Sequence, residues 1–478
     1  MSTLNEKIHA LELRKLAILG ATIAAVSLLI MQHVPTSELL PMPARNTLFV
    51  LIAVIALLVT EVFPIGIVCL LAVPLMYFFK CTPSVPGALS GFTNPILYFV
   101  LASFGISEAL TVVPVSKRLL LFLMKRGGKN TKRLMLAIMV VTALLSSIMS
   151  NVAAAALFVP VVLNFLDVYE NEEDRNKTGR SYMIGLPVAS MIGGMMTPAG
   201  SSINMLAISM LEKNAGMTIT FVQWMFIGIP LTIVLLPIAW LICSKVFPPA
   251  PLEKEKIEAY VDSVTAEIPE KMGAKEKYVV IVLFGMLILW ILSSWFPVLQ
   301  ISAVALIGLA LYFLPGPLRV LTWADFKRSA SIEAFLLLGV MISIGNVISE
   351  SGLNLWIAEV IFPKAFPSST VLVMGFIAVM VFLLLIIIPV APALFAMLSG
   401  PLIAFCGKVG VSPAIAMAAL GLCACNCYLL PLDTVPVITY STGYYKMFDM
   451  PKATVWIQLV MIVICSLWLT IAGGILGI

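Results

Sequence analysis

The strongest constraint on this chain is its series of apolar runs, each long enough to cross a lipid bilayer. A transmembrane helix needs about 20 mostly apolar residues. Hydrophobic residues make up 61% of the sequence and charged residues 11%, whereas soluble domains carry about 25% charged residues. Lipid must therefore solvate most of the surface, and the sequence predicts an all-α polytopic membrane protein. The uninterrupted runs cover residues 16–33, 46–60, 63–79, 95–113, 221–247, 278–296, 299–315, 332–350 and 453–476.

Further apolar tracts are interrupted near their middles by Ser, Asn, Gly, Thr or Pro. Because each tract is longer than one span, each is expected to form two half-helices. We interpret 131–165 and 368–407 as re-entrant hairpins, and 181–212 and 412–445 as broken transmembrane helices. Backbone groups freed at such breaks are tolerated only inside protein or against a cavity. The interruptions run from Ser146 to Val152, from Gly193 to Asn204, from Pro389 to Pro392 and from Cys425 to Pro436.

The interrupted tracts form two matching sets, since each half of the chain carries a hairpin candidate followed by a broken helix. Such matching segments are typical of secondary transporters built from two inverted-topology repeats. The predicted divisions are an N-terminal tail and first helix (1–45), a first repeat (46–247), a cytoplasmic linker (248–277) and a second repeat (278–478). The linker is too short for a functional domain. A short amphipathic interfacial helix is the open alternative there.

Charge placement predicts the orientation in a cell (inner) membrane. We place the N-terminus in the cytoplasm and let the first hairpin re-enter from the cytoplasm and the second from the opposite face. The chain then makes about eleven crossings, and its C-terminus lies on the extracellular or periplasmic side. The first apolar run lacks a small-residue cleavage site, so it is expected to stay as a membrane span. In agreement with the positive-inside rule, all of the 29 Lys and Arg residues fall on the cytoplasmic side except Arg45, Lys80, Lys213, Lys364 and Lys408.

Half-helices that meet inside a membrane predict an anion site. Their N-terminal ends carry unpaired backbone N–H groups and partial positive charge, which suit a carboxylate, phosphate or sulfate. Unwound carbonyls and hydroxyls can also hold a small cation. Ser150 and Asn151 precede a helix-forming run, so they are expected to cap a half-helix and face a ligand, as are Thr197 with Pro198 and Thr434. A purely structural kink is the alternative interpretation of each break.

These motifs resemble those of the divalent anion/sodium symporter (DASS) family over nearly the whole chain. Ser150-Asn151-Val152 is similar to the family's Ser-Asn-Thr hairpin tip, and G-G-M-M-T-P-A-G-S-S-I-N is similar to its Gly-Thr-Pro break. The C-terminal block P-L-D-T-V-P-V-I-T-Y-S-T-G-Y-Y-K-M-F-D-M is also similar. The resemblance implies a homodimeric, elevator-type carrier of di- or tricarboxylates or sulfate, with scaffold and transport domains. The substrate site it implies consists of Ser150, Asn151, Val152, Thr197, Pro198, Ala391, Pro392, Thr434 and Val435.

The resemblance also implies where cations would bind, and this sequence departs from the pattern there. In sodium-coupled members a first cation would lie around Ser146, Asn151 and Met196. In the second hairpin, however, Val390-Ala391-Pro392 stands where another Ser-Asn-Thr is expected. Val and Ala bring no side-chain oxygen, so a second sodium site and half of the substrate clamp lose their ligands. Val152 likewise replaces the first Thr, and Ser202-Ile203 replaces a usual Pro-Pro.

Two functions follow from these departures. Because the family includes sodium-independent exchangers, the lost ligands favour exchange of C4 and C5 dicarboxylates of the succinate, malate and 2-oxoglutarate class. Sodium-coupled symport of a di- or tricarboxylate or sulfate is the alternative, so sodium is the one cofactor considered and it is not favoured.

Asp433 is the acid most deeply embedded in an apolar span, and two roles are open for it. A membrane-embedded acid is a functional hypothesis by default, and Asp433 could bind a cation or proton that offsets substrate charge. Alternatively it caps the half-helix that begins near Thr434, which we favour because a fixed anion would repel an anionic substrate. The breaks carry no basic residue, so the counter-charge for a dianion is not identified.

Other functional classes lack their required residues. Cys423, Cys425 and Cys427 form a C-A-C-N-C cluster, but no His or further Cys completes a tetrahedral metal site. No phosphate-binding G-x-x-x-x-G-K-[ST] loop for an ATP-driven pump is present. The basic residues lie between apolar runs, so they do not indicate nucleic-acid binding. A membrane-embedded enzyme is a distant alternative, because nothing beyond Asp433 suggests a catalytic group.

Overall fold

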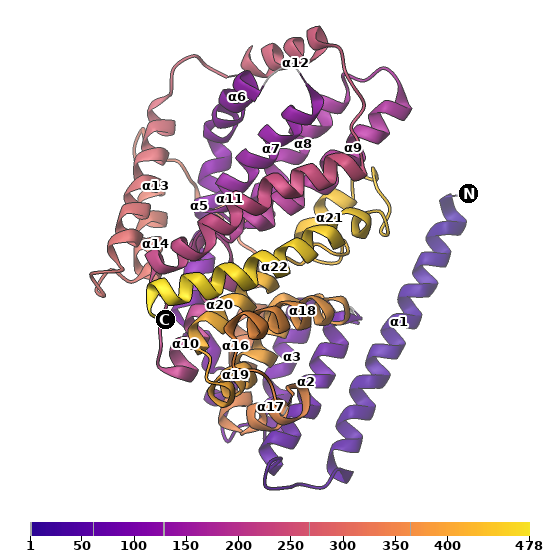
Figure 1. Ribbon diagram of the computed structural model, residues 1–478, viewed down its shortest axis with the longest axis vertical. Coiled ribbons are helices and arrows are strands. Elements are labelled where there is room, and N and C mark those ends of the chain that lie inside the picture. Colours follow the sequence, from indigo (N-terminus) through magenta and orange to yellow (C-terminus); the bar gives the residue numbers. More distant parts are fainter. Residues whose placement is uncertain (1, 61, 128–129, 267, 364) are drawn as a thin grey trace.

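The computed structural model describes residues 2–60, 62–127, 130–266, 268–363 and 365–478, and these fold into helices without any strand (Figure 1). The first half of the chain forms α1 (Ser2–Ile30), η1 (Met31–His33), α2 (Met42–Val59), α3 (Ile65–Phe78), α4 (Val85–Ala88), η2 (Ser90–Thr93), α5 (Pro95–Val112), α6 (Val115–Gly127), α7 (Thr131–Ser146), α8 (Asn151–Leu166), α9 (Glu172–Gly194), η3 (Pro198–Gly200), α10 (Ser202–Ala215) and α11 (Phe221–Val246). The linker and the second half form α12 (Lys254–Ala266), α13 (Ala274–Leu292), α14 (Ile301–Tyr312), α15 (Trp323–Ser329), α16 (Ile332–Glu350), α17 (Leu353–Ile361), α18 (Thr370–Ile387), α19 (Ala391–Val409), α20 (Pro413–Ala424), α21 (Thr434–Tyr440) and α22 (Met450–Leu476).

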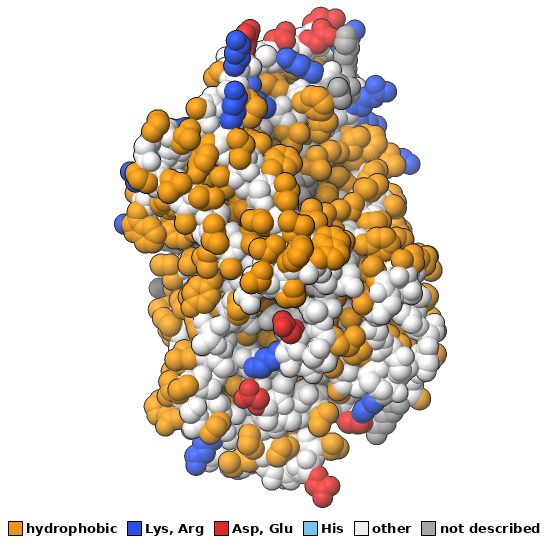
Figure 2. Space-filling model, turned by 90° about the vertical axis from the view of Figure 1, so that its left-hand side faces the viewer, with side chains coloured by type: hydrophobic (Ala, Val, Ile, Leu, Met, Phe, Trp, Pro, Cys, Tyr) orange, Lys and Arg blue, Asp and Glu red, His pale blue; other side chains and the backbone are white. Residues whose placement is uncertain are grey.

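The surface is that of a membrane protein. Among the described residues, 8 helices are long and apolar enough to cross a membrane. Hydrophobic side chains cover the middle of the molecule, while charged side chains gather mainly at one end (Figure 2). On α22, large apolar side chains face outward at four-residue spacing, which is one side of an α-helix: Val455, Leu459, Val463, Leu467, Ile471 and Ile475. This stripe would be costly in water and is favourable against lipid. The count of about eleven crossings stays a prediction.

Each interrupted tract is divided into two helices, at the positions where the sequence places polar residues or proline. The non-helical segments cover residues 147–150 between α7 and α8, and 388–390 between α18 and α19. Between α9 and α10 the chain unwinds over 195–201 around the short turn η3, and between α20 and α21 it unwinds over 425–433. Four breaks therefore lie inside apolar helical tracts, where their backbone groups need partners from the protein itself.

The helices of the two halves follow the same order and exchange partners with each other. α3 packs against α16 while its counterpart α14 packs against α5. In the same way α10 packs against α19, and α21 packs against α8. Reciprocal pairing of this kind is what two inverted repeats related by a two-fold axis produce. The breaks of both halves are thereby brought to the centre of one molecule.

The broken helices occupy that centre. Every described residue of α9 from Ser181 to Gly194 is buried, and so is every residue of α20 from Ala414 to Ala424. A helix that is apolar and buried all round lies inside a helical assembly rather than at its surface. A smaller second core lies between α2, α3, α16 and the second hairpin.

The linker contains a short amphipathic helix, which the sequence analysis gave as an alternative for this segment. This helix, α12, packs against α6, and both lie at the same end of the molecule (Figure 1). The Tyr260 hydroxyl donates to the carbonyl of Val161 at 2.8 Å, and Lys256 pairs with Glu170 at 2.8 Å. A hydrogen bond from Lys256 lowers the pKa of the Glu170 carboxyl. The linker therefore docks on the first hairpin.

The basic residues predicted for the outer face gather at the opposite end. Lys80 and Lys213 line two cavities that share Glu350, and Lys408 pairs with Glu359 of α17. Of the two others, Arg45 donates to the carbonyl of Val34 at 2.9 Å, and Lys364 lies outside the described residues. The orientation relative to the membrane stays a prediction.

Candidate functional site

The tip of the first hairpin is fixed by a buried polar network. The Ser146 hydroxyl, at the end of α7, donates to the side-chain oxygen of Asn151 at 2.7 Å. Ser190 of α9 lies 3.1 Å from the Ser146 hydroxyl and donates to the Asn151 backbone carbonyl at 2.7 Å. Ser146 and Ser190 are fully buried. Met196 was predicted as part of a cation site with Ser146 and Asn151, but among the described residues it forms no hydrogen bond with either of them.

Side chains satisfy the carbonyls that the break in α9 leaves without helical partners. The last carbonyls of a helix have no partner within it. Thr197 donates to the carbonyl of Ser147 at the hairpin tip and accepts from the N–H of Gly200 at 3.1 Å. The Asn204 amide donates to the carbonyls of Gly194 and Thr197 at 2.7 and 2.9 Å. The break is thus a defined structure that Thr197 joins directly to the first hairpin.

Glycines allow α9 to approach this hairpin closely. A Cβ added at Gly194 would lie 2.3 Å from the side-chain oxygen of Asn151, and one added at Gly193 would lie 2.3 Å from the backbone of Ala143. Separations below 3.0 Å are essentially never seen for real Cβ atoms. The Gly193-Gly194 pair is therefore required for the end of α9 to lie against α7 and Asn151.

The fourth break also reaches the hairpin tip. The thiol of Cys425 accepts from the Asn151 amide at 3.7 Å and donates to the carbonyl of Met191 at 3.9 Å. Asp433 caps α21, since its carboxylate accepts from the N–H of Val435 at 3.1 Å and from the Thr434 hydroxyl at 3.4 Å. The prediction of Asp433 as a cap is confirmed, and the expectation that Thr434 itself would cap is wrong. Asp433 takes the position because its carboxylate reaches the second N–H of the helix.

Ser150 occupies the N-cap position of α8, but its side chain makes no capping hydrogen bond, so the expectation of a Ser150 cap is wrong. Its backbone N–H instead donates to the Ser107 hydroxyl of α5 at 3.3 Å. Among the described residues, the N–H groups of Asn151, Val152 and Ala153 have no hydrogen-bond acceptor. This helix end is therefore left with unpaired donors and a half-buried hydroxyl.

The tip of the second hairpin brings no polar side chain to the site. Val390 is the N-cap of α19 and makes no side-chain cap, Ala391 is buried and Pro392 is half-buried. No hydrogen bond among the described residues joins this tip to the Asn151 network. Two buried amide oxygens nearby in the broken helices, those of Asn204 and Asn426, have no hydrogen-bond partner within the described part of the chain.

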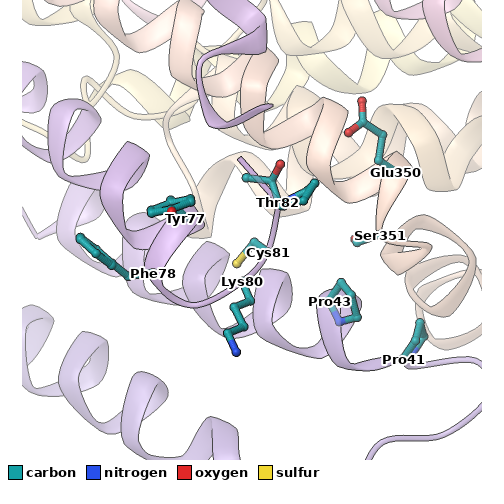
Figure 3. Close-up of a pocket in the computed structure, with 10 residues that line it drawn as sticks. Pro41, Pro43, Tyr77, Phe78, Lys80, Cys81, Thr82, Glu350 and Ser351 are labelled. Atoms are coloured by element: carbon teal, nitrogen blue, oxygen red, sulfur yellow. The ribbon is translucent and has the colours of Figure 1, made fainter. Parts of the chain in front are cut away.

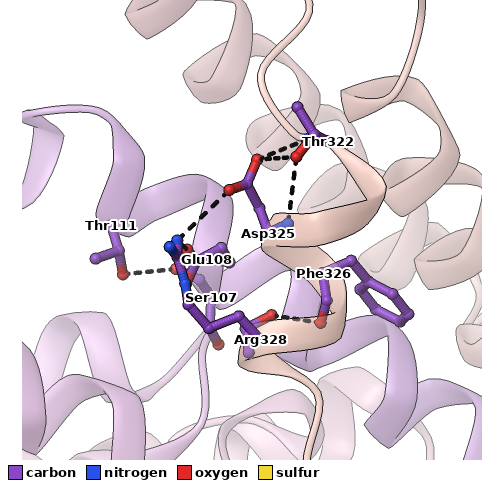
Figure 4. Close-up of polar contacts among 8 residues, drawn as sticks. Ser107, Glu108, Thr111, Thr322, Asp325, Phe326 and Arg328 are labelled. Atoms are coloured by element: carbon purple, nitrogen blue, oxygen red, sulfur yellow. Dashed lines mark hydrogen bonds and ion pairs between the residues drawn. The ribbon is translucent and has the colours of Figure 1, made fainter.

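A cluster of charged side chains lies beside Ser107 (Figure 4). Its neighbour Glu108 pairs with Arg328 of α15 at 2.7 Å, and Arg328 lies 3.5 Å from Asp325. Hydrogen bonds from Thr322 lower the pKa of the Asp325 carboxyl. Glu108 thus joins α5 to α15 through its ion pair with Arg328. The sequence did not identify Ser107, Ser190 or Arg328, because neither a single Ser in an apolar helix nor a single Arg in a short helix forms a motif.

Comparisons with known proteins agree with this geometry. The family model described as "Sodium:sulfate symporter transmembrane region" matches residues 15–478. A protein of Staphylococcus saprophyticus named "Sodium-dependent dicarboxylate transporter SdcS" is 26% identical over 434 residues, which cover 86% of this chain and 82% of the relative. A Cupriavidus necator protein named "Membrane protein" is 24% identical over 357 residues, covering 71% of this chain and 69% of the relative.

A solved structure shares the fold. The crystal structure of the YdaH transporter of Alcanivorax borkumensis, described as having an unusual topology, aligns with a TM-score of 0.55 and 15% sequence identity. The alignment covers 91% of this chain and 99% of that chain. Because the family model spans all but the first few residues, this chain belongs to the sodium:sulfate symporter (DASS) family and is a membrane transporter rather than an enzyme.

Proposed function

We propose that this protein moves C4 and C5 dicarboxylates, of the succinate, malate and 2-oxoglutarate class, across the cytoplasmic membrane by anion exchange. The observation that carries the proposal is the free N-terminus of α8. Its backbone donors are unpaired among the described residues, and Asn151 holds it against the breaks of α9 and α20. The relatives named as dicarboxylate transporters support this substrate class.

A carboxylate at this point would be bound by dipoles rather than by a basic residue. The N-terminal end of a helix carries roughly half a positive charge and several free N–H donors. Around it stand the Ser150 hydroxyl and the exposed residues Val152 and Thr434. The second carboxylate would reach the N-terminus of α19 beyond Ala391, where only backbone groups are offered. The walls of the substrate site would include Val435, Pro198 and Pro392.

The exchange mode rests on the second hairpin. Val390 and Ala391 offer no side-chain oxygen for a cation. We propose that the empty site does not cross the membrane, so the site crosses only when an anion occupies it, and this produces exchange. We further propose that the helices carrying the breaks move as a transport domain against a homodimeric scaffold, with the N-terminus in the cytoplasm and the C-terminus outside.

Sodium-coupled symport is the second candidate, and specific observations favour it. Several relatives are named sodium-dependent. The buried oxygens of Asn204 and Asn426 have no partner among the described residues, and amide oxygens are ligands for small hard cations. In this alternative Ser146, Asn151 and Met196 would belong to the cation site, and Asp433 would add charge.

One transport experiment separates the two candidates. The purified protein is reconstituted into liposomes that contain unlabelled succinate or none. Uptake of labelled succinate is then measured with and without an inward sodium gradient. Exchange predicts uptake that requires internal dicarboxylate and is unchanged when choline replaces sodium. Uptake that requires sodium and ignores the internal dicarboxylate would establish symport instead.

A further inference from the structure

We propose that the cavity between α10, α16 and α19 is a second carboxylate-docking site, at which an incoming substrate displaces Glu350 from Lys213. The inference rests on the proposed dicarboxylate transport and adds a site remote from the Asn151 network. The cavity measures about 470 Å³ and lies at the end of the molecule opposite α12. Its lining consists of Lys213, Asn214, Asn346, Ser349, Glu350, Asn354, Gly400, Ile403 and Ala404.

The ion pair across this cavity is loose. The Lys213 ammonium lies 3.7 Å from the Glu350 carboxylate, and their side chains are 42% and 61% exposed. At this distance the two groups form no hydrogen bond, so the ammonium keeps its donors for another acceptor. An exposed pair of this kind contributes little to stability. A substrate carboxylate therefore competes with Glu350 on nearly equal terms.

The cavity also holds an unused polar atom. The Asn346 side chain is buried and donates to Ser90 at 2.9 Å. Its oxygen has no hydrogen-bond partner among the described residues. This oxygen is an acceptor, so it suits a hydroxyl group of the substrate, as in malate, and not a carboxylate. Donors for a carboxylate come from the amides of Asn214 and Asn354, because the Ser349 hydroxyl already donates to the carbonyl of Gly345 at 3.2 Å. One ammonium among amide donors suits a small carboxylate better than an apolar ligand.

When Glu350 is displaced from Lys213, its carboxylate can turn into a neighbouring cavity. It also lines the neighbouring cavity of about 750 Å³, which extends towards Lys80 and Thr82 (Figure 3). The released carboxylate therefore stays in water rather than being buried without a partner. Lys80 lies on the rim of that cavity and adds positive charge at this end, which raises the local concentration of anions.

The docking site touches the elements that carry the breaks. Lys213 lies in the last turn of α10, whose first turn adjoins the break at Thr197, and Gly400 belongs to the second hairpin. α10 packs closely against α19 and α20, whereas towards α16 it places Lys213 beside Glu350 and Met210 beside Gly345. Displacing Glu350 thus removes the charged link between α10 and α16, and we infer that it eases their separation.

The test measures transport from each face separately. Initial uptake rates in right-side-out and inside-out vesicles give the KM for succinate at both faces. Lys213→Gln is expected to raise the KM roughly five-fold or more at the face bearing α17 and to leave the other face unchanged. Glu350→Gln is expected to lower the KM at the α17 face, because Lys213 loses its competitor. Lys408→Gln, which removes a charge at the same end outside the cavity, is the matched control and is expected to keep the wild-type KM.

A binding measurement separates this site from the transport function. Asn354→Cys places a thiol at the cavity, and all eight native cysteines are buried. Succinate is expected to slow its labelling by an impermeant maleimide, and Lys213→Gln is expected to abolish that protection. Equal KM changes in Lys213→Gln and Lys408→Gln, or no protection by succinate in a protein that transports it, would overturn the docking site. Protection without any succinate transport would uphold the docking site and overturn the proposed function.

Discussion

Asn151 is the residue on which the candidate site depends most. Its side chain joins the two arms of the first hairpin through Ser146 and reaches Cys425 at the fourth break, while its backbone carbonyl accepts from Ser190 of α9. An apolar residue would keep the backbone contact with Ser190 but would lose the side-chain hydrogen bonds to Ser146 and Cys425. The sequence identified Asn151 itself, since an Asn inside an apolar tract stands out. Its partners Ser190 and Cys425 were not predicted as such.

We expect Asn151→Ala to abolish dicarboxylate uptake and the thermal stabilisation that substrate gives to the wild-type protein. The unfolding free energy should fall by about 1–3 kcal/mol, because buried partners lose their hydrogen bonds. Thermal unfolding with and without succinate checks this. Asn171→Ala is the control: Asn171 caps α9 through the N–H of Glu173 at 2.9 Å, so this variant should lose about 1 kcal/mol and keep the substrate effect. A full substrate shift in Asn151→Ala would remove the residue from the site.

Thr197 offers a second test at this scale, because its hydroxyl both donates to Ser147 and accepts from Gly200. Thr197→Val keeps the shape and removes both bonds, so we expect uptake to be lost and stability to fall by about 1–3 kcal/mol. Thr197→Ser keeps the hydroxyl and should retain uptake. Initial rates of the two variants decide the point: equal rates would show that the hydroxyl is dispensable.

At the scale of elements, the contact between α9 and the first hairpin determines whether the site forms. Gly193→Ala would place a Cβ 2.3 Å from the backbone of Ala143 on α7, where no flexible side chain can move away. We expect this overpacking to cost about 1–3 kcal/mol and to lower the apparent melting temperature. Gly285→Ala on α13 is the control, since a Cβ there meets nothing within 4 Å, and Ala is the better helix former. Equal melting temperatures for the two variants would contradict this packing argument.

The charged cluster of Glu108, Arg328 and Asp325 is also an element-scale feature. It attaches α15 to α5 one residue from Ser107, which receives the hairpin tip. The sequence could not predict this contact, because the short helix α15, which carries Arg328, is brought to α5 only by the exchange of partners between the halves. Propensity predicts where helices begin and end, but packing chooses their neighbours.

At the scale of the whole molecule, the predicted orientation can be tested directly. Lys408 and Lys271 are both exposed. The predicted topology places Lys408 on the outer side of the membrane and Lys271 on the cytoplasmic side. In intact cells an impermeant maleimide should label Lys408→Cys, and it should label Lys271→Cys only after the membrane is opened. The buried native cysteines give little background. Labelling in the reverse pattern would invert the topology and exchange the faces in the docking experiment.

The sequence by itself determined that the chain spans a membrane, where its helices break and that the two halves repeat. These features follow from local rules, since hydrocarbon demands continuous apolar helices and any Ser, Asn, Gly or Pro interruption stands out against that background. Only the tertiary structure decided that Ser190 and Cys425 meet Asn151, and that Lys213 meets Glu350 across a cavity. Such pairings join residues far apart in the chain, and they are set by how helices pack in three dimensions rather than by any pattern along the chain.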